Sequence, residues 1–192
     1  MNDLIFYTNP QSRGQTVRWM LEEVGEPYET QILDYASTMK MEPYLSINPM
    51  GKVPAIRHKG KVVSEVAAIC CYLADAFPEA GLTPPINDRA DYYRWVFFTS
   101  GPVEAAFSNK AAGWEPTPER QRMFGYGNYD LAINTLEKAL GGREYIAADH
   151  FTAADLFVGA NVNFMLAFNL LASRPIFVDY APRMTDRHAY PR

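Results

Sequence analysis

Two short stretches of the sequence place backbone groups where they could face a ligand. In NPMGKVPAI, residues 48–56, Pro54 stands where an apolar alternation begins. Proline has no amide hydrogen and is tolerated at strand starts and tight turns, so we expect the backbone beside it to serve something other than the sheet. In SRGQ, residues 12–15, the spacing of Ser and Gln matches a helical capping box. The start of a helix favours an anion, so Ser12 marks a second place for a ligand.

The composition limits the kinds of partner. The 192 residues carry 18 Lys and Arg against 22 Asp and Glu, a formal net charge of −4 with no basic block, which argues against nucleic acid or an anionic membrane. Cys70 and Cys71 are adjacent, and His58, His150 and His188 share no ligand spacing, so neither a disulfide framework nor a metal site is expected. The start MNDLIFY is unlike a signal peptide and no apolar run of membrane-spanning length occurs, which predicts a soluble, cytoplasmic protein.

Residues 1–77 have the pattern of an α/β domain in which alternating runs and helical runs exchange places. The order is βαβαββα, and the crossover rule predicts a parallel first pair of strands, to which a hairpin adds antiparallel strands. The expected strands are 4–8, 28–34, 53–59 and 61–64, and the expected helices are 14–25, 39–45 and 65–77.

The pattern changes after a segment rich in Pro and Gly. Residues 78–86 have no periodicity and predict a linker, and residues 87–192 read almost entirely as helices, so we expect an all-α helical bundle. The Gly101–Pro102 pair should kink the first helix of this bundle without ending it. The helices expected here are 88–107, 118–140, 153–171 and 178–187.

This order of elements, together with three motifs, resembles the soluble glutathione transferases, with a serine-type active site like that of bacterial members. The motifs are NPMGKVPAI, VSEVAAICCYLAD at residues 63–75 and FTAADLF at residues 151–157. The resemblance implies a thioredoxin-like N-terminal domain, an α-helical second domain and glutathione as co-substrate in a cleft between them. It implies a homodimer, and neither a metal nor a permanently bound cofactor. The third motif, with Thr152 and Asp155 as a capping box, is structural and stays outside the site.

The resemblance also assigns residues to glutathione. Pro54 would be cis, and Val53 would offer its amide and carbonyl to the cysteine backbone of the tripeptide. Lys52 would either pair with the glycine carboxylate or lie in solvent. Glu65 would help to hold the γ-glutamyl end, although an acid in a first helical turn also suits the helix dipole. The family usually has Ser or Thr at position 66, and Val66 keeps the helix amide but loses that hydroxyl.

Activation of the glutathione thiol requires a donor near the start of the first helix, because an ordinary thiol is only a few per cent thiolate at neutral pH. In some classes of the family the donor is a tyrosine near the end of the first strand, and in others it is a serine or cysteine before the first helix. The spacing here favours Ser12, with Tyr7 and Asn9 as alternatives. A Ser12 hydroxyl committed to the capping box would leave the helix amides to stabilise the thiolate.

The expected reaction is attack of the bound thiolate on an electrophilic carbon of a small apolar acceptor, a detoxification chemistry. Glu104 and Phe107 lie three residues apart and could line the acceptor pocket. Two alternatives stay open. One is glutathione-dependent disulfide reduction, in which the thiolate attacks sulfur. The other is a non-catalytic binding module that keeps the fold, which the departure at Val66 suggests.

Overall fold

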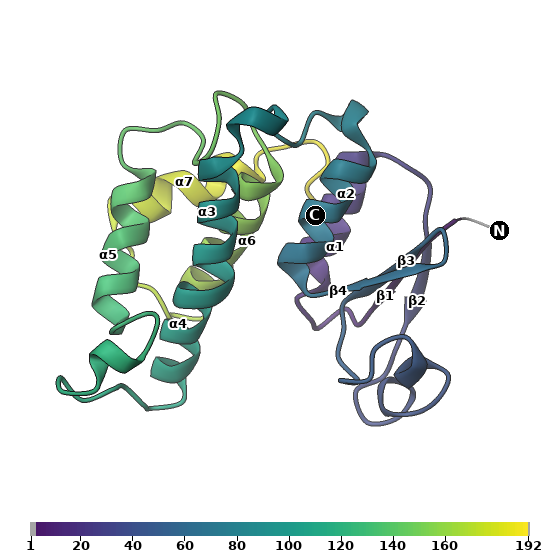
Figure 1. The fold of residues 1–192 in the computed structure, drawn as a ribbon, viewed down its shortest axis with the longest axis horizontal. Helices are drawn as coiled ribbons and strands as arrows, with labels where there is room; N and C mark the ends of the chain where they lie inside the picture. Colours follow the sequence, from purple (N-terminus) through teal and green to yellow (C-terminus); the bar gives the residue numbers. More distant parts are fainter. Residues whose placement is uncertain (1–2, 192) are drawn as a thin grey trace. The chain divides into compact units, whose positions relative to one another are not determined.

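The protein divides into two compact units, which a computed structural model describes over residues 3–191 (Figure 1). The first unit runs to Leu82 and includes the segment from His188, and the second is Thr83–Arg187. Each unit contains its own buried core. Among the described residues, no helix is both long enough and apolar enough to cross a bilayer.

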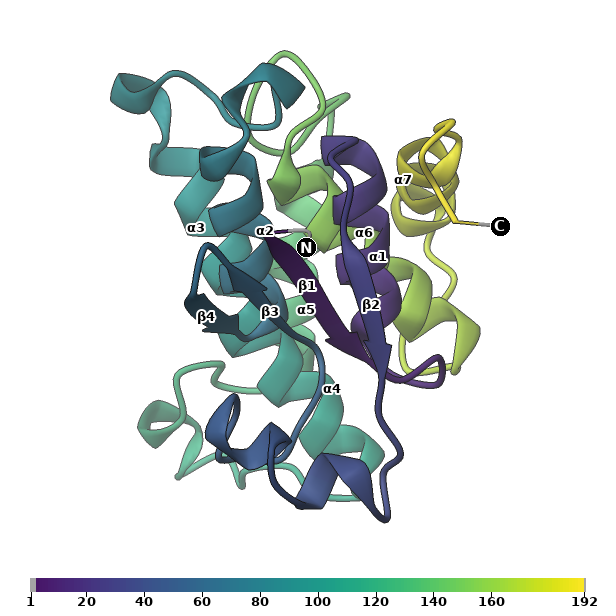
Figure 2. The same ribbon diagram turned by 90° about the vertical axis from the view of Figure 1, so that its right-hand side faces the viewer.

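The first unit is built on a four-stranded mixed sheet. Its strands are β1 (Leu4–Thr8), β2 (Glu29–Ile32), β3 (Ala55–His58) and β4 (Lys61–Ser64), in the order β2-β1-β3-β4 (Figure 2). β1 and β2 are parallel, while β3 runs antiparallel to both β1 and β4. The predicted pairings are confirmed. β3 begins just after Pro54, which has no amide hydrogen to give to a neighbouring strand.

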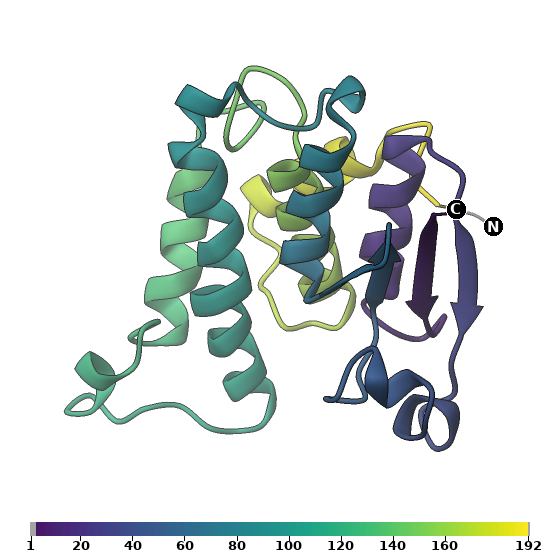
Figure 3. The same cartoon turned by 45° about the vertical axis from the view of Figure 1, so that its right-hand side comes forward.

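Two helices cover one face of this sheet (Figure 3). They are α1 (Gly14–Val24) and α2 (Val66–Ala76), which pack against each other. The hydroxyl of Tyr72 in α2 lies 2.9 Å from Nδ1 of the buried His58 in β3, so this side of β3 faces the helices. The thioredoxin-like arrangement of the unit is therefore confirmed.

The last residues of the chain also belong to the first unit. Tyr190 packs edge-on against Trp19 of α1, with the two ring centroids 5.0 Å apart. The C-terminal segment thus adds an aromatic contact to the buried Trp19 of α1, whereas the sequence pattern assigned this segment to the helical domain.

The opposite face of the sheet meets the segment between β2 and β3. The short helix predicted for residues 39–45 is wrong, because two 3-10 turns, η1 (Thr38–Lys40) and η2 (Tyr44–Ser46), stand there instead. Pro43 lies between the turns, after a cis peptide bond, and proline disfavours helical geometry in the residue that precedes it.

The second unit is all-α, as predicted. A long helical stretch continues through Gly101 and Pro102 by way of a π-helical turn, which confirms that this pair does not end the helix. The elements are η4 (Ile86–Asp88), α3 (Ala90–Phe98), η5 (Thr99–Val103), α4 (Glu104–Ala111), η6 (Gln121–Met123), α5 (Tyr129–Leu140), α6 (Ala153–Ala167) and α7 (Pro175–Thr185). A further 3-10 turn, η3 (Pro78–Ala80), closes the first unit.

The helix predicted for residues 118–140 is wrong in its first half, since α5 begins at Tyr129. Gly127 has a φ of 68°, a left-handed conformation that glycine adopts freely and that interrupts a helix. Asn128 then caps α5, its Oδ1 accepting the amide hydrogen of Leu131 at 2.8 Å. A glycine followed by an asparagine cap therefore sets the true start.

The capping box predicted at the start of α6 is confirmed. Asp155 is fully buried and accepts hydrogen bonds from the backbone and hydroxyl of Thr152, from the amide of Ile146 at 2.7 Å and from the hydroxyl of Tyr180 at 3.0 Å. Burial is the main cause that raises the pKa of this carboxyl group. The motif ties a loop and α7 to α6, which is a structural role.

Candidate functional site

One edge of the sheet gathers several of the residues proposed for glutathione. Ala55 pairs with Tyr7 on one side and with Ser64 on the other. One step further along each strand, Pro54 therefore lies between the end of β1 and the start of α2. Because α1 follows β1 after a short turn, the N-termini of both helices are connected to the same edge.

The turn before β3 exposes a length of unused backbone. The Val53–Pro54 peptide bond is cis, as the resemblance implied. The carbonyl of Lys52 accepts hydrogen bonds from the hydroxyl of Tyr44 and from Nδ2 of Asn48, which holds the turn in place. Within residues 3–191 no hydrogen bond engages the amide or carbonyl of Val53. Val53 can therefore pair with an extended peptide as a strand would.

Two further features fix this turn. Burial is the main cause that raises the pKa of Tyr44 to about 12, so its hydroxyl stays protonated and remains a donor. Gly51 has a φ of 56°, and a Cβ at this position would lie 2.9 Å from the carbonyl oxygen of Met39, so only glycine fits. The side chain of Lys52 is exposed and could reach a carboxylate of a ligand that lies along Val53.

The start of α2 combines an unusual backbone conformation with an open helix end. Glu65 has φ 68° and ψ 119°, a conformation that costs a residue with a side chain about 1–3 kcal/mol and is concentrated at functional sites. No described side chain caps this helix, so its first amides can bind an anion. The exposed Glu65 carboxylate could pair with an ammonium group of a ligand, while the half-buried Val66 has only its backbone amide to donate to an anion.

The start of α1 places the hydroxyl of Ser12 between two backbone groups. Its Oγ donates to the carbonyl of Asn9 at 2.6 Å and accepts from the amide of Gly14 at 2.9 Å. The predicted capping box is wrong in detail, because the side chain of Gln15 bonds to the carbonyl of Pro10 instead of closing on Ser12. Since a hydroxyl has one hydrogen to donate, Ser12 can donate to a thiolate only by giving up its bond to Asn9.

The other two predicted donors, Asn9 and Tyr7, already make contacts elsewhere in the protein. Asn9 is buried, and its side chain donates to the carbonyl of Leu33 at 2.8 Å and accepts from the amide of Gln11 at 2.9 Å. Tyr7 points to the opposite face of the sheet, where its ring packs against Tyr44 with centroids 5.5 Å apart. Neither side chain is as close to the start of α1 as Ser12.

The structure adds Thr8, which the sequence analysis missed. A Cβ on Gly14 would lie only 2.0 Å from Oγ1 of Thr8, so the first residue of α1 must be glycine and the hydroxyl of Thr8 lies against the helix start. This hydroxyl donates to the carbonyl of Asn9 over a long distance of 3.4 Å. Strand alternation could have indicated Thr8, because it lies on the opposite face from Tyr7.

Comparison with known proteins relates the domain that contains this sheet edge to a known family. A family model described as "Glutathione S-transferase, N-terminal domain" matches residues 12–76. The glutathione S-transferase GST-4.5 of Xanthomonas campestris is 27% identical over 159 residues, which cover 79% of this chain and 78% of that protein. Residues 12–76 therefore match the N-terminal domain of the glutathione transferase family, and the chain is similar to glutathione transferases over most of its length. The matched region extends from Ser12 past Val66 and so holds both helix starts and the cis-proline turn.

Two solved glutathione transferases extend the likeness to both units. A glutathione transferase from Methylococcus capsulatus has a TM-score of 0.79 at 25% identity and covers 97% of this chain and 95% of its own. A sphingomonad glutathione S-transferase solved in complex with glutathione has a TM-score of 0.77 at 26% identity, covering 97% and 94%. The all-α second unit is therefore the helical domain that this family carries after its thioredoxin-like domain.

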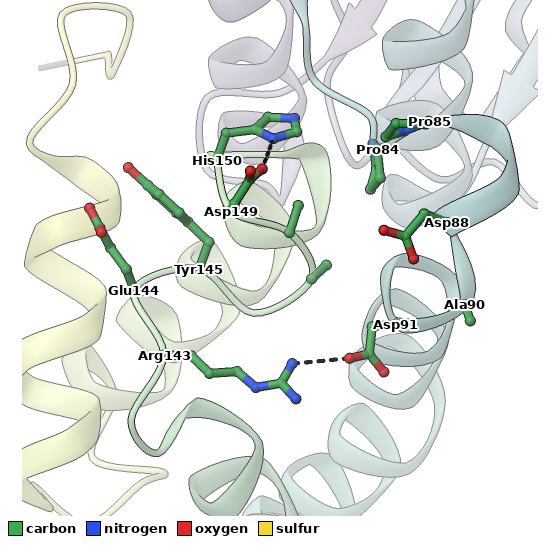
Figure 4. Close-up of a pocket in the computed structure, with 12 residues that line it drawn as sticks. Pro84, Pro85, Asp88, Ala90, Asp91, Arg143, Glu144, Tyr145, Asp149 and His150 are labelled. Atoms are coloured by element: carbon green, nitrogen blue, oxygen red, sulfur yellow. Dashed lines mark hydrogen bonds and ion pairs between the residues drawn. The ribbon is translucent and has the colours of Figure 1, made fainter.

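The helical unit carries its own cavity, of about 830 Å³ (Figure 4). Within it, Arg143 pairs with Asp91 at 3.0 Å and Nδ1 of His150 lies 2.9 Å from Oδ1 of Asp149, and the lining also contains the acidic residues Asp88 and Glu144. Neither residue proposed for the acceptor lines this cavity. Phe107 is only 4% exposed and packs against Phe164, and Glu104 begins α4 at a half-buried position.

Proposed function

We propose that this protein binds glutathione along Val53 and activates its thiol for transfer to a small electrophile, in the cytoplasm. The observation that carries the proposal is the unused amide and carbonyl of Val53 beside the cis-Pro54 bond, at a sheet edge where α1 and α2 both begin. The glutathione bound in the sphingomonad relative supports the same ligand class.

The two helix starts would receive two groups of the tripeptide that can carry negative charge, the γ-glutamyl carboxylate and the cysteine thiol. The γ-glutamyl group would lie at α2, its carboxylate on the amide of Val66 and its ammonium near the Glu65 carboxylate. The thiol would lie at α1, where the helix amides and the Ser12 hydroxyl favour the thiolate. Lys52 would pair with the glycine carboxylate. Ser12 would exchange its bond to Asn9 for one to sulfur as the ligand enters.

The chemistry would then follow from a thiolate held in place. Its sulfur attacks an electrophilic carbon, a carbon–sulfur bond forms, and the leaving group departs with its bonding electrons, while the thiol proton passes to solvent. The thiol of Cys70 is a poor candidate for this step, because it is buried and burial raises its pKa. The sulfur would therefore come from glutathione.

Calorimetry and two assays test the proposal. Glutathione should bind with a dissociation constant below the millimolar range, and Glu65→Gln should weaken binding about tenfold, since a hydrogen bond to a charged group is worth about 1.5–3 kcal/mol. Glu79→Gln removes an exposed charge from η3 and should change nothing. No binding at millimolar glutathione would overturn the proposal.

The assays distinguish the two reactions and the module. Turnover of an aryl chloride would support transfer to carbon, and turnover of a small disulfide alone would support disulfide reduction instead. Binding of glutathione without turnover of either substrate would favour the non-catalytic module. This outcome is tested because the Ser12 hydroxyl already donates its hydrogen to the carbonyl of Asn9.

A homodimer is proposed on the exposed aromatic surface of α3. Tyr93 and Phe97 are four residues apart and are 41% and 64% exposed, so they form one apolar stripe on the helix. Light scattering should give twice the mass of one chain, and Phe97→Ser should shift the protein toward the monomer. A monomer at micromolar concentration in the unaltered protein would contradict this proposal.

A further inference from the structure

A second cavity, of about 540 Å³, lies within the first unit, on the sheet face opposite α1 and α2. The sheet contributes Tyr7, Gln31 and Arg57, and the segment that holds η1 and η2 contributes the rest. This volume suits a small organic molecule. The cavity has no part in the proposed site for glutathione, which uses the edge of the sheet and the two helix starts.

Most polar side chains that line this cavity already have partners in the protein. The Ser46 amide donates to Oε2 of Glu42 at 3.2 Å, so the Glu42 carboxylate is held at the rim beside η2. Four others are engaged in the same way: Gln31 with Glu29, Thr38 with the amide of Asp34, Tyr44 with the carbonyl of Lys52, and Ser46 with the carbonyl of Pro43.

Two polar groups in the cavity are left over. Within residues 3–191 neither the guanidinium of Arg57 nor the hydroxyl of Tyr7 has a hydrogen bond or ion pair. Tyr7 is only 5% exposed, whereas Arg57 is exposed to solvent. The two groups come from the same face of the sheet, because Tyr7 pairs with Ala55, two residues before Arg57. Such diagonal neighbours lie about 7–8 Å apart.

The walls around these two groups are apolar and partly aromatic. The rings of Tyr7 and Tyr44 lie together with centroids 5.5 Å apart, and Leu33 and Ile47 pack against the same cluster. A flat hydrocarbon body could lie on this surface while one end reaches the unpaired cation and hydroxyl. Glu42 at the rim would repel a second negative group at the other end.

We propose that this cavity binds a small aromatic carboxylate. Arg57 would hold the carboxylate through its two-pronged guanidinium, which matches carboxylate geometry. The Tyr7 hydroxyl would donate a further hydrogen bond, and the aromatic body would lie against Tyr44, Leu33 and Ile47. This assigns Arg57 and Tyr7 to a ligand site on the back of the sheet that is separate from the glutathione site.

Calorimetric measurement of 2-naphthoate binding tests the proposal. The dissociation constant should be on the order of 0.1 mM. The uncharged 2-naphthylmethanol and the cationic 2-naphthylmethylamine should bind at least about tenfold more weakly, because they lack the charge that Arg57 pairs with. Equal binding of all three compounds would overturn the proposal, since it would show no role for the carboxylate.

Variants assign the binding to this cavity. Arg57→Gln should raise the dissociation constant of 2-naphthoate by about tenfold to a hundredfold, and Tyr7→Phe should raise it by about threefold to tenfold. The matched control is Lys61→Gln, which removes an exposed cation from the neighbouring strand outside the cavity and should stay within about twofold. If Lys61→Gln weakens binding as much as Arg57→Gln, the attraction is a general charge effect and the assignment fails.

A competition experiment with an active-site ligand tests whether this cavity is distinct from the acceptor pocket. S-Hexylglutathione, which carries a hydrocarbon chain on the sulfur, would fill both the glutathione and the acceptor positions of the proposed active site. 2-Naphthoate should bind with the same dissociation constant in its presence. Displacement of 2-naphthoate by S-hexylglutathione would overturn the proposal, and it would leave the proposed transferase function intact.

Discussion

Replacement of Ser12 by Ala separates activation of the thiol from support of the helix start. The change removes one oxygen that donates to Asn9 at 2.6 Å and accepts from Gly14 at 2.9 Å. If the hydroxyl turns to the glutathione sulfur, its loss removes a hydrogen bond to an anion, worth about 1.5–3 kcal/mol. At about 1.36 kcal/mol per unit, the pKa of the bound thiol should rise by about one to two units.

A purely structural Ser12 gives a different pair of results. The amide of Gly14 and the carbonyl of Asn9 would lose their partner, and the free energy of unfolding should fall by about 1–2 kcal/mol. The pKa of the bound thiol would then stay almost unchanged, because the helix amides survive. Stability and thiol pKa therefore report the two roles separately.

The assay is a titration of thiolate absorbance in the glutathione complex, with thermal unfolding of each variant alongside. The matched variants are Tyr7→Phe and Thr8→Val, each of which removes one hydroxyl and keeps the shape of the side chain. A thiol pKa that does not move in Ser12→Ala but rises in either control would refute the role of Ser12 and identify the donor.

Three further outcomes follow from the same structure. Val66→Ser should tighten glutathione by up to about tenfold in calorimetry, because it adds one hydrogen bond at the start of α2; unchanged affinity would argue against the γ-glutamyl end lying there. Burial lowers the pKa of His58 below its ordinary value of 6.5, so the unfolded chain takes up the proton first and stability should decline as pH falls below about 6.5. Denaturant unfolding at several pH values should show this decline, and His58→Gln should flatten it. Asp155→Ala should lower the free energy of unfolding by about 3 kcal/mol or more, as several buried donors lose their acceptor; a loss below 1 kcal/mol in the same measurement would contradict this account.

Local sequence patterns predicted most of the regular elements of both units. The strand over residues 4–8 and the helix that begins at Gly14 were predicted within one residue, because alternation and helical periodicity are strong there. The errors fell where one residue changes the local geometry. Pro43 replaced an expected helix with two 3-10 turns, and Gly127 delayed the start of α5.

The candidate site was predictable only as far as backbone motifs define it. The cis bond before Pro54 was implied by the resemblance to the glutathione transferases, and the helical pattern of residues 65–77 indicated that Glu65 lies at the start of α2. The hydrogen-bond partners of Ser12 could not be predicted, because they depend on how the turn after β1 folds back. Thr8 was missed because its closeness to Gly14 is set by packing between strand and helix.

The alternation of β1 connects the two proposed ligand sites. Tyr7 and Thr8 are neighbours in sequence, but a strand sends successive side chains to opposite faces. Thr8 therefore lies against the start of α1, where a thiolate would be stabilised, and Tyr7 lies with Tyr44 in the cavity behind the sheet. A slip of one residue in the β1 register would exchange the two hydroxyls. The pairing of Tyr7 with Ala55 thus determines which hydroxyl faces which site, and it separates the choice of thiol donor from the chemistry of the carboxylate cavity.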